Sequence, residues 1–253
     1  MRVIRSFVIA FSTYSRIPMP QVEWSDENRK YSMCFFPLIG AVIGLILWGW
    51  LWLCDALKIG MLLKGVVGAI IPLLVTGGIH MDGFMDTSDA MASWQTRERR
   101  LEILKDTHTG AFAVIGCTGY LLLSAAVYGE MPVQAAPMLM GVFMISRSLS
   151  ALALAFFKSA RPGGMMDGFA RTAHRRIVSI TAAVYAVLCA VLWAVCGKWI
   201  ATGCFAAVAA CFAYYRHMAY KNFGGVTGDL AGWFVQITEL VLAVVIVLGG
   251  KIG

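Results

Sequence analysis

Long runs of apolar residues alternate with short polar segments along the whole chain. Each run approaches the roughly 20 residues that an α-helix needs to cross a hydrocarbon core about 30 Å thick. The pattern therefore predicts an all-α fold, a polytopic integral membrane helical bundle of about seven transmembrane helices. The predicted spans are 33–54, 61–79, 110–129, 131–157, 177–196, 199–215 and 230–249.

Two of these runs are less regular than the others. The run 61–79 contains Gly65, Gly68 and Pro72, and the run 199–215 is short and is followed by Arg216. Breaks of this kind are tolerated in membrane helices where neighbouring groups satisfy the freed backbone. Either of these two spans can therefore be tilted, kinked or re-entrant.

The first 17 residues form a separate segment. Its apolar stretch, Phe7 to Phe11, is too short to span a bilayer and is flanked by Arg2, Arg5 and Arg16. No small-residue cleavage site of a signal peptide follows it. We expect an N-terminal interfacial helix that lies on the membrane.

Composition excludes an ordinary soluble domain. Hydrophobic residues make up 59% of the chain and charged residues 14%, with a mean hydropathy of +0.74, whereas soluble domains carry roughly a quarter charged residues. No linker or low-complexity tract interrupts the sequence, so we expect a single domain over residues 1–253. The seven cysteines lie in apolar runs without a C-x-x-C pair, which favours packing over metal binding or disulfides.

Basic residues gather on one side of the predicted topology. The segments 1–32, 80–109, 158–176 and 215–229 carry sixteen lysines and arginines, and the segments on the other side carry four. By the positive-inside rule, the first set faces the cytoplasm. The net charge of +7 then indicates anionic small-molecule substrates and contact with membrane lipid. Basic and aromatic residues do not interleave as they do on nucleic-acid-binding surfaces, so no nucleic acid partner is expected.

The segment 76–89 is the most polar part of this apolar chain, and it reads Thr-Gly-Gly-Ile-His-Met-Asp-Gly-Phe-Met-Asp-Thr-Ser-Asp. If the segment is helical, its spacing brings Asp82, Asp86 and Asp89 into an arc of about 60°. Such carboxylates repel one another unless they share a cation, and oxygen ligands suit Mg²⁺, which also bridges to substrate phosphates. The alternative is a solvated helix start whose acids favour the positive end of the dipole.

A second polar stretch, 97–110, has apolar residues at helical spacing and predicts an amphipathic helix on the cytoplasmic surface. Its Arg97 and Lys105 can neutralise a diphosphate, and Asp106, just before the next span, can complete the metal shell. The alternative for the basic residues is a positive-inside loop whose long side chains extend to the membrane interface.

The loop 221–229 leads into the last span and reads Lys-Asn-Phe-Gly-Gly-Val-Thr-Gly-Asp. Glycines let backbone N–H groups approach a phosphate closely, and the helix start that follows adds a favourable dipole. Thr227 and Asp229 are therefore candidates for contacts with substrate and metal. Asp229 can also simply cap the helix.

Two charged residues lie inside predicted spans. At 1.5 Å per residue, Arg147 and Glu239 each lie about 15 Å below the cytoplasmic ends of their spans. Because isolated charges are costly at that depth, we expect both to face the bundle interior. They either pair with each other or line a polar cavity that reaches the site.

These separated motifs resemble those of the cobalamin synthase family, also called adenosylcobinamide-GDP ribazoletransferases. The resemblance covers nearly the whole chain, and the combination is more specific than any single piece. The motifs are Ser15-Arg16-Ile17-Pro18-Met19-Pro20, Phe36-Pro37-Leu38-Ile39-Gly40, the run Gly77 to Thr87, Arg97 and Arg99 with Leu101-Glu102-Ile103 and Asp106, Ser146-Arg147, and the run Gly224 to Asp229.

The resemblance implies a multi-pass enzyme of the cell inner membrane, with its active site on the cytoplasmic side. It implies that this enzyme joins adenosylcobinamide-GDP to alpha-ribazole or alpha-ribazole 5′-phosphate, with Mg²⁺ and with release of GMP, in the final steps of cobalamin biosynthesis. The sequence does not fix the oligomeric state, and a homo-oligomer is compatible with it.

Phosphoryl transfer depends mainly on positioning and on neutralisation of charge, which assigns roles to the polar residues of these motifs. The implied metal ligands are Asp82, Asp86, Asp89 and Asp229. The implied catalytic residues are His80, Asp82 and Asp106. The implied substrate-binding residues are Arg16, Arg97, Lys105, Arg147, Thr227 and Glu239.

His80 has two interpretations. Its unperturbed pKa near neutrality suits a general base toward the attacking hydroxyl, and its position two residues before Asp82 also suits a hydrogen bond that orients a ligand carboxylate. An aspartate is the alternative base. The chain departs from the family pattern at His108, where many members carry arginine, and at Gln236, where a glutamate is frequent.

Other functions fit the sequence less well. CDP-alcohol phosphotransferases and aromatic prenyltransferases also bind a diphosphate through metal-bound aspartates, but the former expect an Ala-Arg pair where Ala90-Met91 stands and the latter expect a second aspartate cluster, which 158–229 lacks. A transporter is a third alternative. Its carboxylates would lie near the membrane midplane, whereas most acids here lie at one face.

Overall fold

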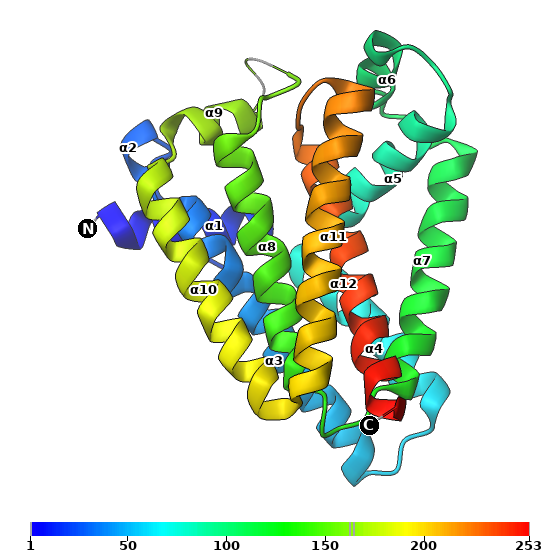
Figure 1. Cartoon of the computed structure of the whole chain (residues 1–253). Helices are drawn as coiled ribbons and strands as arrows, with labels where there is room; N and C mark the ends of the chain where they lie inside the picture. The colour runs from blue at the N-terminus through cyan, green and yellow to red at the C-terminus, as the bar shows by residue number, and fades with distance from the viewer. Residues whose placement is uncertain (1, 162, 164, 253) are drawn as a thin grey trace.

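The computed structural model describes residues 2–161, 163 and 165–252, and these residues form an all-α bundle without a strand (Figure 1). The first helices are α1 (Arg2–Tyr14), α2 (Asp26–Arg29), α3 (Ser32–Ala56), α4 (Met61–Thr76), α5 (Ile79–Ala92) and α6 (Arg97–Ile103). The later helices are α7 (Ala111–Glu130), α8 (Met138–Phe156), α9 (Met165–Thr172), α10 (Arg175–Cys196), α11 (Lys198–Phe223) and α12 (Gly228–Ile252).

The prediction of a polytopic membrane bundle is confirmed. Six helices in the described part of the chain are long and apolar enough to cross a membrane: α3, α7, α8, α10, α11 and α12. A seventh crossing is formed if α4 and α5, which are bent by 100° at a short break, count as one broken span. The irregularity expected for 61–79 therefore lies at the carboxyl end of α4.

Two predicted boundaries are wrong. The span expected at 131–157 begins only at Met138, because Pro132 and Pro137 favour a turn after α7. The span expected at 199–215 continues to Phe223 as α11. The arginine that was taken to end it, Arg216, lies inside the helix.

The break between α4 and α5 comes from two glycines. Gly77 and Gly78 have φ values of +67° and +80°, in the left-handed region where other residues are strained. The backbone N–H of Arg16 donates to the carbonyl of Val75 at 2.8 Å, which fixes the end of α1 beside this break. The helix expected near the N-terminus is present as α1. It packs against α3 through Phe7 and Phe11.

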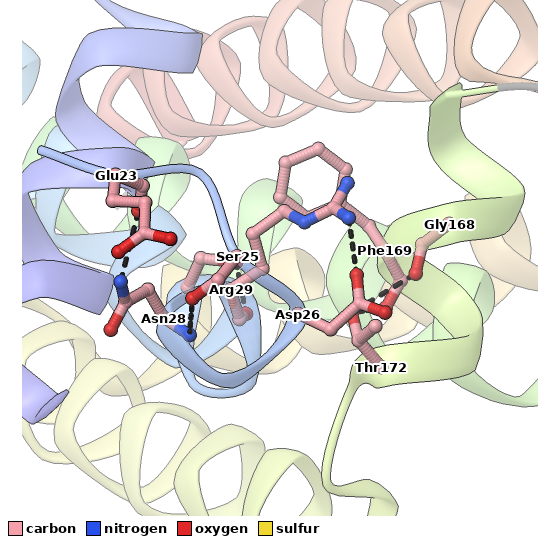
Figure 2. Close-up of polar contacts among 9 residues, drawn as sticks. Glu23, Ser25, Asp26, Asn28, Arg29, Gly168, Phe169 and Thr172 are labelled. Atoms are coloured by element: carbon pink, nitrogen blue, oxygen red, sulfur yellow. Dashed lines mark hydrogen bonds and ion pairs between the residues drawn. The ribbon is translucent and has the colours of Figure 1, made fainter.

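Figure 1 shows α2, α6 and α9 at one end of the long helices and the C-terminus at the opposite end. We call the first end the basic end, because α2, α6 and α9 belong to the polar segments in which sixteen lysines and arginines lie. Figure 2 shows one connection across it: Arg29 of α2 pairs with Asp26 and lies 5.6 Å from the ring centroid of Phe169 in α9.

Close helix contacts in the bundle depend on small residues, as is usual in membranes. A Cβ added to Gly40 of α3 would lie 2.2 Å from the carbonyl oxygen of Phe143 in α8, and one added to Gly44 would lie 2.3 Å from the Cα of Met140. The helix backbones therefore touch along this seam. Gly49 lies in the same helix with nothing within 4 Å of its added Cβ.

We expect Gly40→Ala to destabilise the protein by about 1–3 kcal/mol, because the added methyl group must push α3 away from α8. Gly49→Ala is the matched control and should be neutral or stabilising by up to about 1 kcal/mol, because alanine favours the helix. Thermal unfolding of both purified variants in detergent measures the difference. Equal unfolding midpoints for the two variants would contradict this packing.

Candidate active site

A cavity of about 450 Å³ is lined by residues of α1, α3, α5, α8 and α12 and by Arg161, in a polar segment of the basic end. Apolar walls surround a small set of polar side chains, as is common in ligand sites. The aromatic and apolar walls include Tyr14, Phe36, Ile79 and Leu154, and the polar lining includes His80, Asp82, Arg161, Thr227 and Asp229. We call this the first cavity.

The start of α12 places Asp229 in the first cavity. Thr227 caps this helix, since its hydroxyl oxygen accepts from the N–H of Leu230 at 3.2 Å. Asp229 therefore does not provide the cap, and it pairs with Arg161 at 3.3 Å. Its side chain remains 27% exposed, which leaves the carboxylate accessible to a ligand.

Glycines bring α5 against the start of α12. A Cβ added to Gly83 would lie 2.7 Å from the carbonyl oxygen of Asp229, and one added to Gly232 would lie 3.0 Å from the carbonyl oxygen of His80. No larger side chain fits at Gly83 without a shift of the two backbones. This contact joins the acids of α5 to Asp229, although they are far apart in the sequence.

The acids are close enough to act on one another. The half-buried carboxylate of Asp86 lies near enough to Asp82, Asp229 and Asp89 to feel their negative charges, and among the described residues the charge of Arg161 opposes them. One arginine cannot neutralise four carboxylates. The arrangement therefore has an excess of negative charge that favours a bound cation.

Asp89 has a defined structural role. Its two carboxylate oxygens accept from the backbone N–H groups of Gly110 at 2.7 Å and Ala113 at 2.8 Å, at the start of α7. A Cβ added to Gly110 would lie 2.6 Å from the same carboxylate. Asp89 of α5 thus caps the start of α7 and does not line the first cavity, although sequence reasoning grouped it with the metal ligands.

The fit of a divalent ion depends on Asp82 and Asp229. Among the described residues, no three histidine, cysteine, aspartate or glutamate side chains lie so as to hold a metal ion by themselves. The expected cluster of three ligands from α5 is therefore not assembled. Mg²⁺ usually takes only one or two carboxylates and completes its shell with water and substrate phosphates. Asp82 and Asp229, which share the first cavity, fit that requirement.

His80 lies deep in the first cavity and is only 5% exposed. Its ring lies 5.5 Å from that of Phe36 and 6.3 Å from that of Tyr14, between centroids. The Nε2 atom is buried and has no hydrogen-bond partner within the described part of the chain. None of the described carboxylates is bonded to this ring, which favours a polar ligand as the missing partner.

A second cavity, of about 620 Å³, adjoins the first and shares Ile79 and Asp82 with it. It lies where α1 meets the break between α4 and α5. Arg16 lines it, together with the hydroxyl groups of several serines and threonines. Arg16 and Asp82 thus belong to one continuous polar region.

Three other predicted residues lie outside both cavities. Arg97 donates to the carbonyl of Phe223 at 2.8 Å and packs its guanidinium group against Gly224, so it holds the end of α11. Lys105 is exposed. Asp106 is 54% exposed and pairs with His108. A hydrogen bond from the backbone N–H of His108 and a second contact with its ring hold the pKa of the Asp106 carboxyl below its usual range.

Arg147 and Glu239 pair with each other, as one of the two sequence alternatives proposed. Each is 1% exposed, and Glu239 also accepts from the hydroxyl of Ser146 at 2.9 Å. The Arg147 guanidinium donates to the carbonyl of Phe143 at 3.0 Å and lies 5.8 Å from the ring centroid of Phe36. Neither residue lines the two cavities, so nothing in their position supports direct contact with substrate.

Sequence reasoning missed Arg161 as a site residue. It was counted only as a positive charge of a polar segment, yet it lines the first cavity, pairs with Asp229 and donates to the carbonyl of Leu101 at 2.7 Å. The signal available in the sequence was weak, because Arg161 lies in a loop without an adjacent acid. Tyr14 was missed as well, although it directly precedes the Ser15-Arg16 motif.

Comparison with known proteins identifies relatives over almost the full length. The family model described as Cobalamin-5-phosphate synthase matches residues 6–247. A protein of Lachnoclostridium phytofermentans named adenosylcobinamide-GDP ribazoletransferase is 41% identical over 98% of this chain and 96% of its own length. Proteins of the same name from Desulfitobacterium hafniense and Pseudomonas putida are 31% and 30% identical, over 95% and 96% of this chain and 95% and 98% of their own lengths. No solved structure matches.

The buried pair gives a stability prediction. Glu239→Leu should destabilise the protein by about 3–5 kcal/mol, because it leaves the Arg147 guanidinium buried without a counter-charge. The double variant Arg147→Met/Glu239→Leu should recover most of that loss, since no unpaired charge remains. The test compares thermal unfolding midpoints in detergent. If the double variant loses as much as Glu239→Leu and the single variant Arg147→Met together, the two residues do not depend on each other.

Proposed function

The chain belongs to the Cobalamin-5-phosphate synthase family, and from this premise we propose how its basic end carries out the adenosylcobinamide-GDP ribazoletransferase reaction. The acceptor is alpha-ribazole or its 5′-phosphate. A ribose hydroxyl of the acceptor attacks the phosphorus nearest the cobinamide. The bond from that phosphorus to the bridging oxygen of the diphosphate breaks, and GMP leaves with the bridging oxygen and its electron pair.

The observation that carries this proposal is the convergence of Asp82, Asp229, Arg161 and His80 on one cavity. Two carboxylates and an arginine suit a diphosphate held with a divalent ion. Asp82 and Asp229 would hold Mg²⁺. When bound, the ion supplies neutralisation of the charge on the diphosphate as its bond breaks.

Arg161 has two tasks in this account. Its pairing with Asp229 orients that carboxylate, and its guanidinium group donates hydrogen bonds to the phosphate oxygens that enter the cavity. A hydrogen bond from its guanidinium group to the carbonyl of Leu101 holds the side chain in position for both roles. The position of the group is therefore set before substrate binds, which favours electrostatic stabilisation of the transition state.

His80 is the proposed general base. Its unpartnered Nε2 lies in the same cavity as Asp82, with aromatic rings on its other sides. A neutral imidazole in such an apolar setting accepts the proton of the attacking hydroxyl. Asp82 remains the alternative base, as the sequence also allowed.

The distribution of charge supports a cytoplasmic location for the site. The basic end carries sixteen of the twenty-one lysines and arginines, and the positive-inside rule assigns such an end to the cytoplasm. The protein is therefore proposed to lie in the inner membrane with its cavities open to the cytoplasmic face. Nucleotide substrates are available on that side.

The alternatives from the sequence have less support. The family match argues against a CDP-alcohol phosphotransferase and an aromatic prenyltransferase. A transporter would need polar groups along a path through the bundle. Instead, Arg147 and Glu239 neutralise each other at 1% exposure.

Asp82→Asn tests the assignment of the acids, because it removes one negative charge and keeps the shape of the side chain. Purified protein with Mg²⁺, adenosylcobinamide-GDP and alpha-ribazole should release GMP, and the variant should be slower by about a hundredfold or more. Release of GMP and formation of the joined product are both followed by chromatography.

The matched control is Asp55→Asn. Asp55 lies near the carboxyl end of α3 and lines neither cavity, so this variant should keep the wild-type rate. Both variants must show the unfolding midpoint of the wild type. Full activity of a folded Asp82→Asn variant would refute the metal and phosphate assignment. Absence of GMP release from the wild type would refute the proposed reaction itself.

A further inference from the structure

The first and second cavities meet at Asp82 and Ile79 but differ in charge. Asp82 and Asp229 line the first cavity with Arg161. Among the described residues that line the second cavity, Arg16 is the one cation and Asp82, at the shared boundary, is the one acid. Two ligands can therefore reach Asp82 from different sides, and an anion that is not bound to a metal fits better beside Arg16.

Arg16 is held in place by local structure. Its backbone N–H is bonded to Val75, and its side chain lies over Gly77 so closely that an added Cβ there would lie 2.3 Å from Nε. Gly77 therefore serves two purposes, since it breaks the helix and leaves room for the guanidinium group. No carboxylate is paired with Arg16 in the hydrogen bonds and ion pairs of the described residues, which leaves its donors for a ligand.

The rest of the second cavity suits a nucleoside. The hydroxyls of Thr13, Ser15 and Thr76 donate their hydrogens to helix carbonyls at 2.7–2.8 Å, so towards a ligand they act as acceptors for sugar hydroxyl groups. Leu73, Met81 and Met85 supply apolar surface for a flat ring. The volume of about 620 Å³ lies within the usual range of roughly 300–1,000 Å³ for small-molecule sites.

We propose that the second cavity binds the acceptor nucleotide and that Arg16 recognises its phosphate monoester. This inference rests on the proposed function, and it assigns the two substrates to the two sides of Asp82. The description of the family, Cobalamin-5-phosphate synthase, contains a phosphate in the product. Arg16 therefore determines the preference for a phosphorylated acceptor over an unphosphorylated one, while the diphosphate of the other substrate lies in the first cavity.

The test measures this preference as a ratio. The ratio is kcat/KM with alpha-ribazole 5′-phosphate divided by kcat/KM with alpha-ribazole, at saturating adenosylcobinamide-GDP. Arg16→Gln should lower it by about tenfold to a hundredfold, because a charge-assisted hydrogen bond to the phosphate is lost. Arg16→Lys keeps the charge and should lower it less. Arg99→Gln, an exposed arginine that pairs with Glu102 outside both cavities, should leave it unchanged.

A second pair of variants keeps the arginine. Gly77→Ala and Gly78→Ala introduce similar backbone strain, since both residues have positive φ, but only the methyl group at Gly77 would collide with Arg16. Gly77→Ala should lower the ratio and Gly78→Ala should not. If either variant fails to fold, the Arg16 variants alone decide the matter.

Three results would overturn the inference. If the wild-type protein releases GMP and the ratio is unchanged in Arg16→Gln, phosphate recognition by Arg16 is rejected. The proposed function is then still supported. A higher KM for adenosylcobinamide-GDP at an unchanged ratio assigns Arg16 to the diphosphate. A ratio that shifts when phosphatidic acid is added to phosphatidylcholine vesicles, in wild type but not in Arg16→Gln, assigns the cavity to a lipid phosphate.

Discussion

Repulsion among the carboxylates at the basic end is the constraint on which the site depends. Asp82, Asp86 and Asp229 lie near one another because Gly83 allows α5 to touch the start of α12. The apolar core of the bundle supplies the stability that holds them together despite the repulsion. Under the proposed function, a bound cation would relieve that repulsion and attract the anionic substrate, so binding energy would be available at the proposed site.

The buried ion pair of Arg147 and Glu239 differs from the acids of the first cavity, because its charges are balanced. Arg147 and Glu239 neutralise each other at 1% exposure and join α8 to α12 beneath Phe36. Their pairing leaves no charge for a ligand. The acids of the first cavity are more exposed and are balanced only in part, by Arg161. The neutral pair thus joins two helices in the interior, whereas the acids that are balanced only in part line a cavity at the basic end.

The spans could be predicted from the sequence, because the free energy of apolar transfer depends on composition and length alone. The bend after α4 could not be located in the same way. The sequence placed Gly77 and Gly78 inside the predicted span 61–79, and only their left-handed backbone conformation shows that the helix breaks there. The end of α11 was misplaced because Arg216 is stabilised by the rings of Phe157 and Tyr220, which lie 5.8 and 5.2 Å away.

The site was predicted in part. Helical spacing correctly placed Asp82, Asp86 and Asp89 on one helix, but it could not reveal that the start of α7 lies beside Asp89 and takes both of its oxygens. Arg161 is 79 residues from Asp82 in the sequence, and only the tertiary fold brings both to one cavity. Pairwise contacts across the bundle have no local pattern that a single sequence can show.

The most direct test of the account is the binding of Mn²⁺, as a substitute for Mg²⁺, followed by electron paramagnetic resonance in the presence of adenosylcobinamide-GDP and without acceptor. The wild type should bind the ion, and the folded double variant Asp82→Asn/Asp229→Asn should bind it at least about tenfold more weakly, because both carboxylate ligands are lost. An unchanged Kd for Mn²⁺ in that variant would contradict the central claim that these two carboxylates hold the ion.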